Sequence, residues 1–113
     1  MAERQITIEL LRVFAVVPTI PTLNHRMFLS NLDLMWIPIN KVQRILFYKT
    51  GCQENEFSAL VEILKMSLSL VLMDFYPLGG RLDIKGEEQS GWPEVDCNDA
   101  RVEFIEASID MAF

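Results

Sequence analysis

The chain of 113 residues has few of the residue types that build catalytic and metal sites. It contains one histidine and two cysteines, whereas a structural zinc ion takes about four protein ligands, so we expect no metal site. Cys52 and Cys97 lie far apart and follow no secretory signal, which favours free thiols over a disulfide. No run of about 18 uncharged apolar residues is present, so no transmembrane segment is expected.

Positive charge is also scarce. The chain has 10 Lys and Arg against 16 Asp and Glu, a net charge of −6 with no basic run, which argues against nucleic-acid binding. Residues 1–5 lead into an alternating segment, unlike the smooth apolar run of a signal peptide. We therefore expect a soluble cytoplasmic protein that binds neither nucleic acid nor membrane. Because half of its residues are hydrophobic, the chain has the material for one domain, or part of one.

Apolar periodicity predicts one long helix over residues 55–75. Its apolar side chains recur with the i, i+3, i+4, i+7 spacing that places them on one face of a helix. Asn55 is predicted to cap the first turn. Pro77 is predicted to end the helix because proline has no backbone N–H and disfavours helical geometry in the preceding residue. Residues 76–80 are interpreted as the helix stop and the turn that follows it.

Alternating patterns predict five strands around this helix. The first spans residues 6–17, with a bulge near Leu10 and Leu11, where the alternation changes parity. Residues 42–49 are apolar on both faces at their centre, as in a strand inside a sheet. Three more strands are predicted at 81–85, 94–97 and 101–107, whereas 18–22 reads as extended coil and 85–93 as a loop. The order β-β-α-β-β-β predicts an α+β fold with mixed α/β layers.

No pattern of residues predicts a catalytic, cofactor-binding or metal-binding site. His25 has no acidic residue nearer on its C-terminal side than Asp33, and it is interpreted as an exposed or half-exposed loop residue. The acidic side chains of the final third sit at predicted turns and strand exteriors and are interpreted as a solvated face. They are Asp83, Glu87, Glu88, Glu94, Asp96, Asp99, Glu103, Glu106 and Asp110.

Four ordered blocks resemble the N-terminal part of the plant BAHD acyl-CoA-dependent acyltransferases, the HxxxD-type transferases. The resemblance covers nearly the whole chain and includes the Pro-Thr-Ile-Pro-Thr opening at residues 18–22. The blocks are Leu29-Ser30-Asn31-Leu32-Asp33-Leu34, Leu46-Phe47-Tyr48-Lys49, Leu64-Lys65-Met66-Ser67-Leu68-Ser69, and Asp74-Phe75-Tyr76-Pro77-Leu78-Gly79-Gly80-Arg81-Leu82. Family members often have alanine where Gly79 stands.

This resemblance implies part of a chloramphenicol-acetyltransferase-like acyltransferase domain. It also implies transfer of an acyl group from the co-substrate acyl-CoA to a hydroxyl or amine acceptor in plant specialised metabolism. The family's catalytic His-x-x-x-Asp and its Asp-Phe-Gly-Trp-Gly do not occur here, and Leu29 stands where an aspartate would have to follow His25. We therefore expect residues 1–113 to be a partial N-terminal domain that stops before the catalytic motif, binds no cofactor and is inactive alone.

The resemblance also suggests substrate-pocket residues. Residues 35–40 look like the family's loop on the acceptor side of the channel, so Trp36, Pro38 and Asn40 are candidates, and ordinary packing of a loop Trp and Pro is an equally open interpretation. The competing function is a non-catalytic interaction or binding protein derived from such an enzyme, which self-associates through exposed sheet edges.

Two charged residues, Asp33 and Arg81, belong to the strongest of the matching blocks. Because a lone buried charge is costly, we expect both to be buried or half-buried and to be paired or hydrogen-bonded to the backbone.

Overall fold

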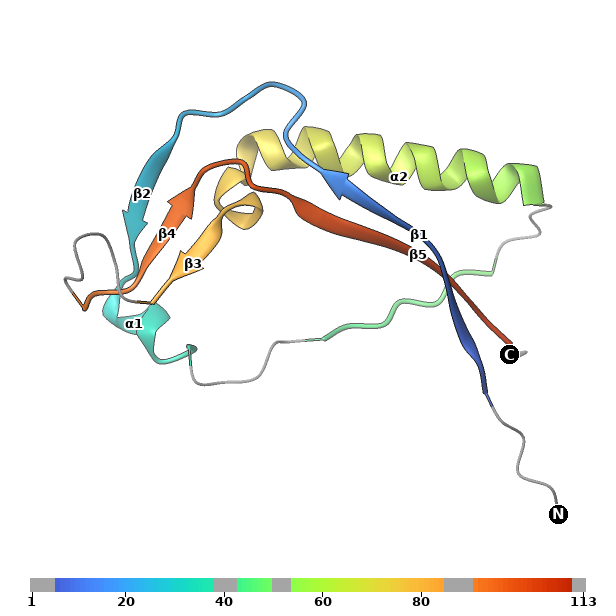
Figure 1. Cartoon of the computed structure of the whole chain (residues 1–113), viewed down its shortest axis with the longest axis horizontal. Coiled ribbons are helices and arrows are strands. Elements are labelled where there is room, and N and C mark those ends of the chain that lie inside the picture. Colours follow the sequence, from blue (N-terminus) through green and yellow to red (C-terminus); the bar gives the residue numbers. More distant parts are fainter. Residues whose placement is uncertain (1–5, 38–42, 50–53, 85–90, 111–113) are drawn as a thin grey trace, which may run out of the picture.

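The computed structural model describes residues 6–37, 43–49, 54–84 and 91–110. One long helix lies beside two small antiparallel sheets (Figure 1), which confirms the α+β class. The elements are β1 (Ile8–Val16), β2 (His25–Phe28), α1 (Asn31–Leu34), α2 (Glu54–Asp74), the 3-10 helix η1 (Tyr76–Gly79), β3 (Arg81–Asp83), β4 (Glu94–Cys97) and β5 (Val102–Ile109).

The first sheet is the antiparallel pair β1–β5. Its register runs from Ile8 opposite Ile109 to Val16 opposite Val102, and it shifts by one residue between Leu10 and Arg12. The bulge expected from the change of parity is therefore present. A bulge adds one residue to one strand and returns the side-chain alternation to phase, which is why two opposite parities fit one strand.

The second sheet has the order β2-β4-β3, with β4 in the centre. His25 lies opposite Cys97 on one side of β4, and Arg81 lies opposite Asp96 on the other. β4 has the predicted bounds, β3 ends at Asp83 instead of residue 85, and β5 runs two residues further than expected.

The predicted strand at residues 42–49 is wrong over the residues that the structure describes, 43–49, none of which belongs to a strand. A segment that is apolar on both faces becomes a strand only when a neighbour bonds its backbone. Neither sheet supplies that neighbour, and Ile45 is 78% exposed. The second strand of the chain is instead β2, in a stretch for which no strand was expected. The short helix α1 was not expected either.

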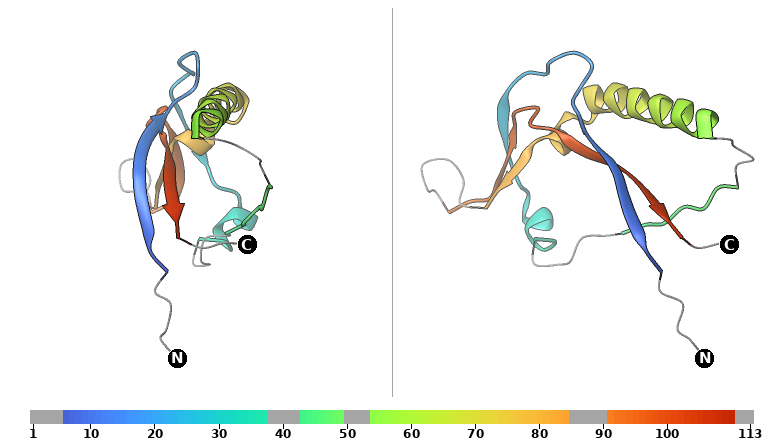
Figure 2. Two further views of the ribbon diagram at one scale, coloured as in Figure 1. Left: turned by 90° about the vertical axis from the view of Figure 1, so that its right-hand side faces the viewer. Right: turned by 45° about the vertical axis from the view of Figure 1, so that its right-hand side comes forward.

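Helix α2 confirms the long amphipathic helix, although Asn55 lies inside its first turn and not at its cap. The helix ends at Asp74, and Pro77 stands in the first turn of η1, where proline is tolerated because its missing N–H is not needed. Figures 1 and 2 show α2 along one side of the β1–β5 pair. Ser69 fastens it to the chain after β1, since its Oγ donates to the Val17 carbonyl over 2.7 Å.

The turn between β4 and β5 connects the two sheets and is held by several hydrogen bonds. The carboxylate of Asp99 accepts from the backbone N–H of Thr22 over 2.7 Å and from its hydroxyl over 2.5 Å. The backbone N–H of Arg101 donates to the Gly79 carbonyl over 3.0 Å. Asp99 has φ 50°, a left-handed conformation that aspartate tolerates better than most residues. These contacts bring three distant parts of the chain together.

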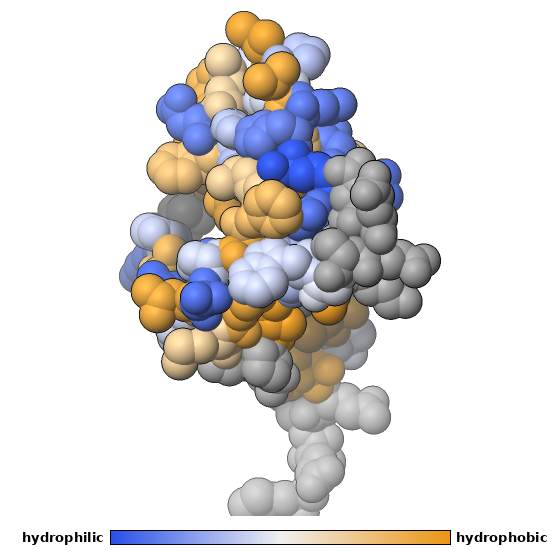
Figure 3. Space-filling model, turned by 90° about the vertical axis from the view of Figure 1, so that its left-hand side faces the viewer, coloured by the Kyte–Doolittle hydropathy of each residue, from blue (hydrophilic) through white to orange (hydrophobic). Residues whose placement is uncertain are grey.

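The hydrophobic core is small. Among the described residues only four hydrophobic side chains are buried, those of Val16, Val61, Leu72 and Cys97. The chain exposes 9940 Å², whereas a compact protein of its mass exposes roughly 6,300 Å². Hydrophobic side chains also reach the surface at the end that carries β2, β3 and β4 (Figure 3). In the described ranges, no helix has both the length and the hydropathy to cross a membrane.

Candidate functional site

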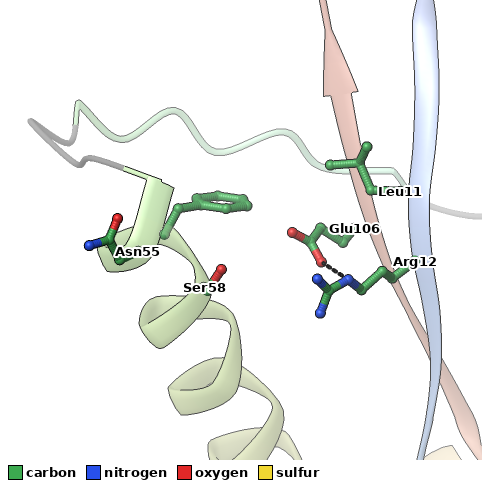
Figure 4. Close-up of a pocket in the computed structure, with 6 residues that line it drawn as sticks. Leu11, Arg12, Asn55, Ser58 and Glu106 are labelled. Atoms are coloured by element: carbon green, nitrogen blue, oxygen red, sulfur yellow. Dashed lines mark ion pairs between the residues drawn. The ribbon is translucent and has the colours of Figure 1, made fainter.

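A pocket of about 550 Å³ lies between the first turns of α2 and the strands β1 and β5. Figure 4 shows Leu11, Arg12 and Glu106 coming from the strands, and Asn55 and Ser58 from the helix. Phe57 completes the lining. Arg12 Nε and Glu106 Oε2 are 3.9 Å apart, so one positively charged and one negatively charged side chain face each other in the pocket wall.

This pocket lacks the groups of a hydrolase or transferase centre. Among the described residues, no histidine or cysteine lines it, and a serine hydroxyl such as that of Ser58 needs an adjacent base before it becomes a nucleophile. The Arg12 side chain is 67% exposed and that of Glu106 is 10% exposed, and at 3.9 Å the pair is too far apart for a hydrogen bond. The pocket offers polar contacts to a small molecule, and no chemistry follows from its lining residues.

A cluster of four charged side chains crosses the second sheet. We call it the Arg26 cluster, after its central residue. Three nitrogens of the Arg26 guanidinium each face a different carboxylate: Nε lies 2.5 Å from Glu94, one terminal nitrogen lies 2.6 Å from Asp83, and the other lies 3.5 Å from Asp96. The pKa of Arg26 is raised above its ordinary high value, first by the hydrogen bond to Glu94 and then by the one to Asp83.

This arrangement corrects the expectation that the acidic residues of the final third form a solvated face. Glu94 is only 4% exposed, and Asp83 and Asp96 are half-buried. Asp99 and Glu106 are also half-buried, whereas Glu103 and Asp110 are exposed, as expected, and Glu87 and Glu88 lie outside the described residues. Burying a carboxylate without a partner is costly, and the Arg26 guanidinium supplies the partner.

Sequence reasoning missed the Arg26 cluster because it left Arg26 outside any strand. One signal was present: Glu94 and Asp96 are two residues apart in a correctly predicted strand, so they share a face.

His25 is half-exposed, as expected, but it begins β2 and does not lie in a loop. Its Nδ1 lies 3.2 Å from the Leu23 carbonyl, which can only accept, so Nδ1 donates there. The neutral ring then accepts at Nε2 from the Tyr76 hydroxyl, 3.2 Å away. Neither nitrogen contacts a carboxylate of the described residues, so the ring has no partner to orient it as a general base.

The substrate-pocket candidates are only partly described. Trp36 follows α1, donates its backbone N–H to the Asp33 carbonyl over 3.0 Å and is 65% exposed. It does not line the pocket at α2. Pro38 and Asn40 lie outside the described residues, so the substrate role of the three residues stays a prediction.

Asp33 and Arg81 are exposed, so the burial expected for them is wrong. Their predicted hydrogen bonds to backbone are present. Asp33 accepts from the Ser30 N–H over 2.9 Å and closes a capping box at the start of α1. Arg81 donates to the carbonyls of Gly80 and Arg101, each over 2.9 Å. Surface caps satisfy these charged groups without removing them from water. The Ser30 backbone, and then its hydroxyl, hold the pKa of Asp33 below its ordinary value.

Cys97 is a fully buried free thiol, as expected, and Cys52 lies outside the described residues. Burial raises the pKa of the Cys97 thiol, and the negative charges of Asp96 and Asp99 raise it further, which keeps the sulfur protonated and unreactive. Within the ranges that the structure describes, no three His, Cys, Asp or Glu side chains gather in a way that could hold a metal ion.

Comparison with known proteins gives a consistent result. The sequence model of the Transferase family matches residues 6–113. A shikimate O-hydroxycinnamoyltransferase of Nicotiana tabacum is 35% identical over 95 residues, 84% of this chain and 20% of the relative. A stemmadenine O-acetyltransferase of Catharanthus roseus is 40% identical over 94 residues, 81% of this chain and 20% of the relative. A BAHD acyltransferase of Arabidopsis thaliana is 41% identical over 56 residues, 48% of this chain and 12% of the relative. The chain thus spans about a fifth of the length of most of these relatives, following the 20% and 21% coverage of the longer matches.

Proposed function

Because this chain belongs to the Transferase family of plant BAHD acyltransferases, we propose that it forms one wall of an acyltransferase channel. The enzyme that contains this wall moves an acyl group from acyl-CoA to a hydroxyl or amine acceptor. The hydroxycinnamoyl and acetyl transfers named for the relatives support this reaction class.

The observation that carries the proposal from the geometry is the unfinished apolar surface. On the described residues, 30 large hydrophobic side chains are at least 40% exposed and four hydrophobic side chains are buried, which leaves an extensive apolar surface. Apolar side chains of 45–48 and of α2, including Ile45, Leu46 and Leu64, contribute to it. A wall that packs against further protein accounts for these side chains, because apolar surface of this extent is unfavourable in water.

The reaction needs a base that this chain does not supply. The acceptor O–H or N–H loses its proton while its oxygen or nitrogen attacks the thioester carbonyl carbon; the new C–O or C–N bond forms, the C–S bond breaks, and the CoA thiolate takes up a proton. A positioned base contributes roughly 10²–10⁴-fold to such a step. His25 is held by Leu23 and Tyr76, and the His-x-x-x-Asp motif does not occur in the sequence. We infer that the 113-residue chain alone has no transferase activity.

A segment graft tests this proposal. Residues 6–113 replace the matching segment of the tobacco shikimate O-hydroxycinnamoyltransferase, and hydroxycinnamoyl transfer to shikimate is followed by chromatography. We expect the graft to keep its turnover within about a hundredfold of the parent, whereas the parent without the segment and the chain alone show none. A folded graft as inactive as the deletion contradicts the proposal.

The same exposed surface favours a second candidate, an interaction protein that pairs with its own copies through sheet edges. Size-exclusion chromatography with light scattering separates the two. A discrete oligomer of the chain, together with an inactive graft, supports the interaction protein, whereas an active graft supports the channel wall.

A further inference from the structure

We propose that Arg26 is a positioning residue for the segment that carries Trp36. The inference rests on the proposed function and on the expectation, implied by the family resemblance, that this segment lies on the acceptor side of the channel. It gives a structural reason for the position of that segment. The segment is connected to the carboxylate partners of Arg26 through β2, which pairs with β4.

Hydrogen bonds fix the chain at successive points between β2 and Trp36. Directly after β2, the N–H of Leu29 donates to the Pro93 carbonyl over 3.3 Å, and the Leu29 carbonyl accepts from the Trp92 indole over 3.1 Å. The next residue, Ser30, begins the capping box of α1. The backbone N–H of Trp36 then donates to the Asp33 carbonyl over 3.0 Å.

Burial does not hold this segment. Trp36 is 65% exposed, and none of the four residues of α1 is buried. A single helical turn has little stability of its own in water. The location of Trp36 therefore depends on where β2 places the start of the series.

β2 in turn depends on the Arg26 cluster. The strand has four residues, and β4 is its only pairing partner in the part of the chain that the structure describes. Arg26 reaches from β2 across Glu94 and Asp96 of β4 to Asp83 of β3, so one side chain ties all three strands together. Its planar guanidinium can bond separate carboxylates with separate nitrogens, which a lysine ammonium does less well.

Loss of the Arg26 charge also leaves the buried Glu94 carboxylate without its guanidinium partner. Glu94 is the first residue of β4 and directly follows Trp92 and Pro93, the two residues that bond to Leu29. The same substitution thus loosens β2 and disturbs the residues to which the segment is fastened.

The first test uses the 113-residue chain and its two tryptophans, Trp36 and Trp92. Proton–nitrogen correlation NMR resolves the two indole N–H signals, assigned with Trp36→Phe. We expect Arg26→Met to speed hydrogen exchange of the Trp92 indole N–H by at least about tenfold. Arg12→Met makes the same chemical change in the Arg12–Glu106 ion pair of the other sheet, and it should leave that exchange unchanged. Equal exchange in Arg26→Met and wild type overturns the proposal.

The second test uses the active graft described above. We expect Arg26→Met to raise KM for the acceptor about tenfold and to leave KM for the acyl-CoA within about twofold. Trp36→Ala should have a similar effect, and the double variant should be no worse than either single variant, because both changes remove the same placement. Additive effects, or an equal loss in both KM values, overturn the proposal.

Arg26→Lys keeps the proposal testable if Arg26→Met does not fold. It retains one positive charge beside Glu94, so we expect a rise in acceptor KM of about threefold, between wild type and Arg26→Met. A Lys variant with a KM unchanged from wild type contradicts a role for the three-way guanidinium contact. An inactive wild-type graft refutes the proposed function, and the indole exchange then still decides whether Arg26 positions the segment.

Discussion

Two adjacent glycines after α2 provide matched substitutions with opposite expected effects. A methyl group added at Gly80 would lie 2.4 Å from the Asp96 carbonyl oxygen and 3.2 Å from that of Pro77. At Gly79 the nearest atom would be Leu72 Cδ2, at an ordinary contact distance of 4.0 Å. Gly80 has φ −82°, which any residue adopts, so space and not backbone conformation requires glycine there.

The sizes of the two effects follow from these distances. The atoms that crowd Gly80 are backbone atoms, so Gly80→Ala must displace β4 from η1, at a cost of about 1–3 kcal/mol typical of overpacking. Gly79→Ala meets no such obstacle and restricts the unfolded chain, so we expect it to stabilise the fold by about 0.4–1 kcal/mol.

Urea unfolding followed by far-ultraviolet circular dichroism measures both changes. With a slope of about 1–3 kcal/mol per molar urea, the midpoint for Gly80→Ala should fall by several tenths of a molar or more. The midpoint for Gly79→Ala should rise. If Gly80→Ala is as stable as the wild type, the close approach of Gly80 to β4 is refuted.

Two further predictions concern the core and a helix cap. Leu72→Ala, at a side chain that is 1% exposed, should cost about 2–5 kcal/mol in urea unfolding, whereas Leu78→Ala, at 72% exposed, should change stability by less than about 0.5 kcal/mol; equal costs would show that Leu72 is not core. The capping box lowers the pKa of Asp33, so its stabilising effect is complete above the ordinary value of 3.8 and is lost as the pH falls through the lower folded-state pKa. An NMR titration of the Ser30 amide should therefore have its midpoint below 3.8, Asp33→Asn should abolish it, and a midpoint above 3.8 would contradict the cap.

The predictable elements are those encoded by neighbours in sequence. The periodicity of α2 spans many turns, so its presence was clear, although its first residue was misplaced by one. The bulge at Leu11 was legible because a change of parity has few other causes in one strand. β4 is a short strand bounded by Pro93 and the turn residue Asn98, and its bounds were correct.

The elements that were not predicted depend on distant partners. β2 has no strong strand pattern of its own, and it becomes a strand because β4 supplies its hydrogen bonds. The two strands lie about 70 residues apart in the chain, as the pairing of His25 with Cys97 shows. The reverse holds for residues 43–49, whose composition favours a strand but which find no pairing partner among the described residues. The Arg26 cluster joins three strands, so no local pattern contains it.

Polar and apolar residues of the family blocks are satisfied to different degrees. Asp33 and Arg81 of these blocks, and Arg26 just before the first block, each bond groups within the chain, over distances of 2.5–2.9 Å for the closest contacts. Most of the large apolar side chains stay in water, and apolar burial is the main term that offsets chain entropy. The polar contacts therefore specify how the strands and caps are arranged, but they do not supply the free energy that keeps the arrangement folded. We infer that the chain gains stability when its apolar face is covered. The guanidinium N–H groups of Arg26 should therefore exchange hydrogen more slowly in the graft than in the chain alone.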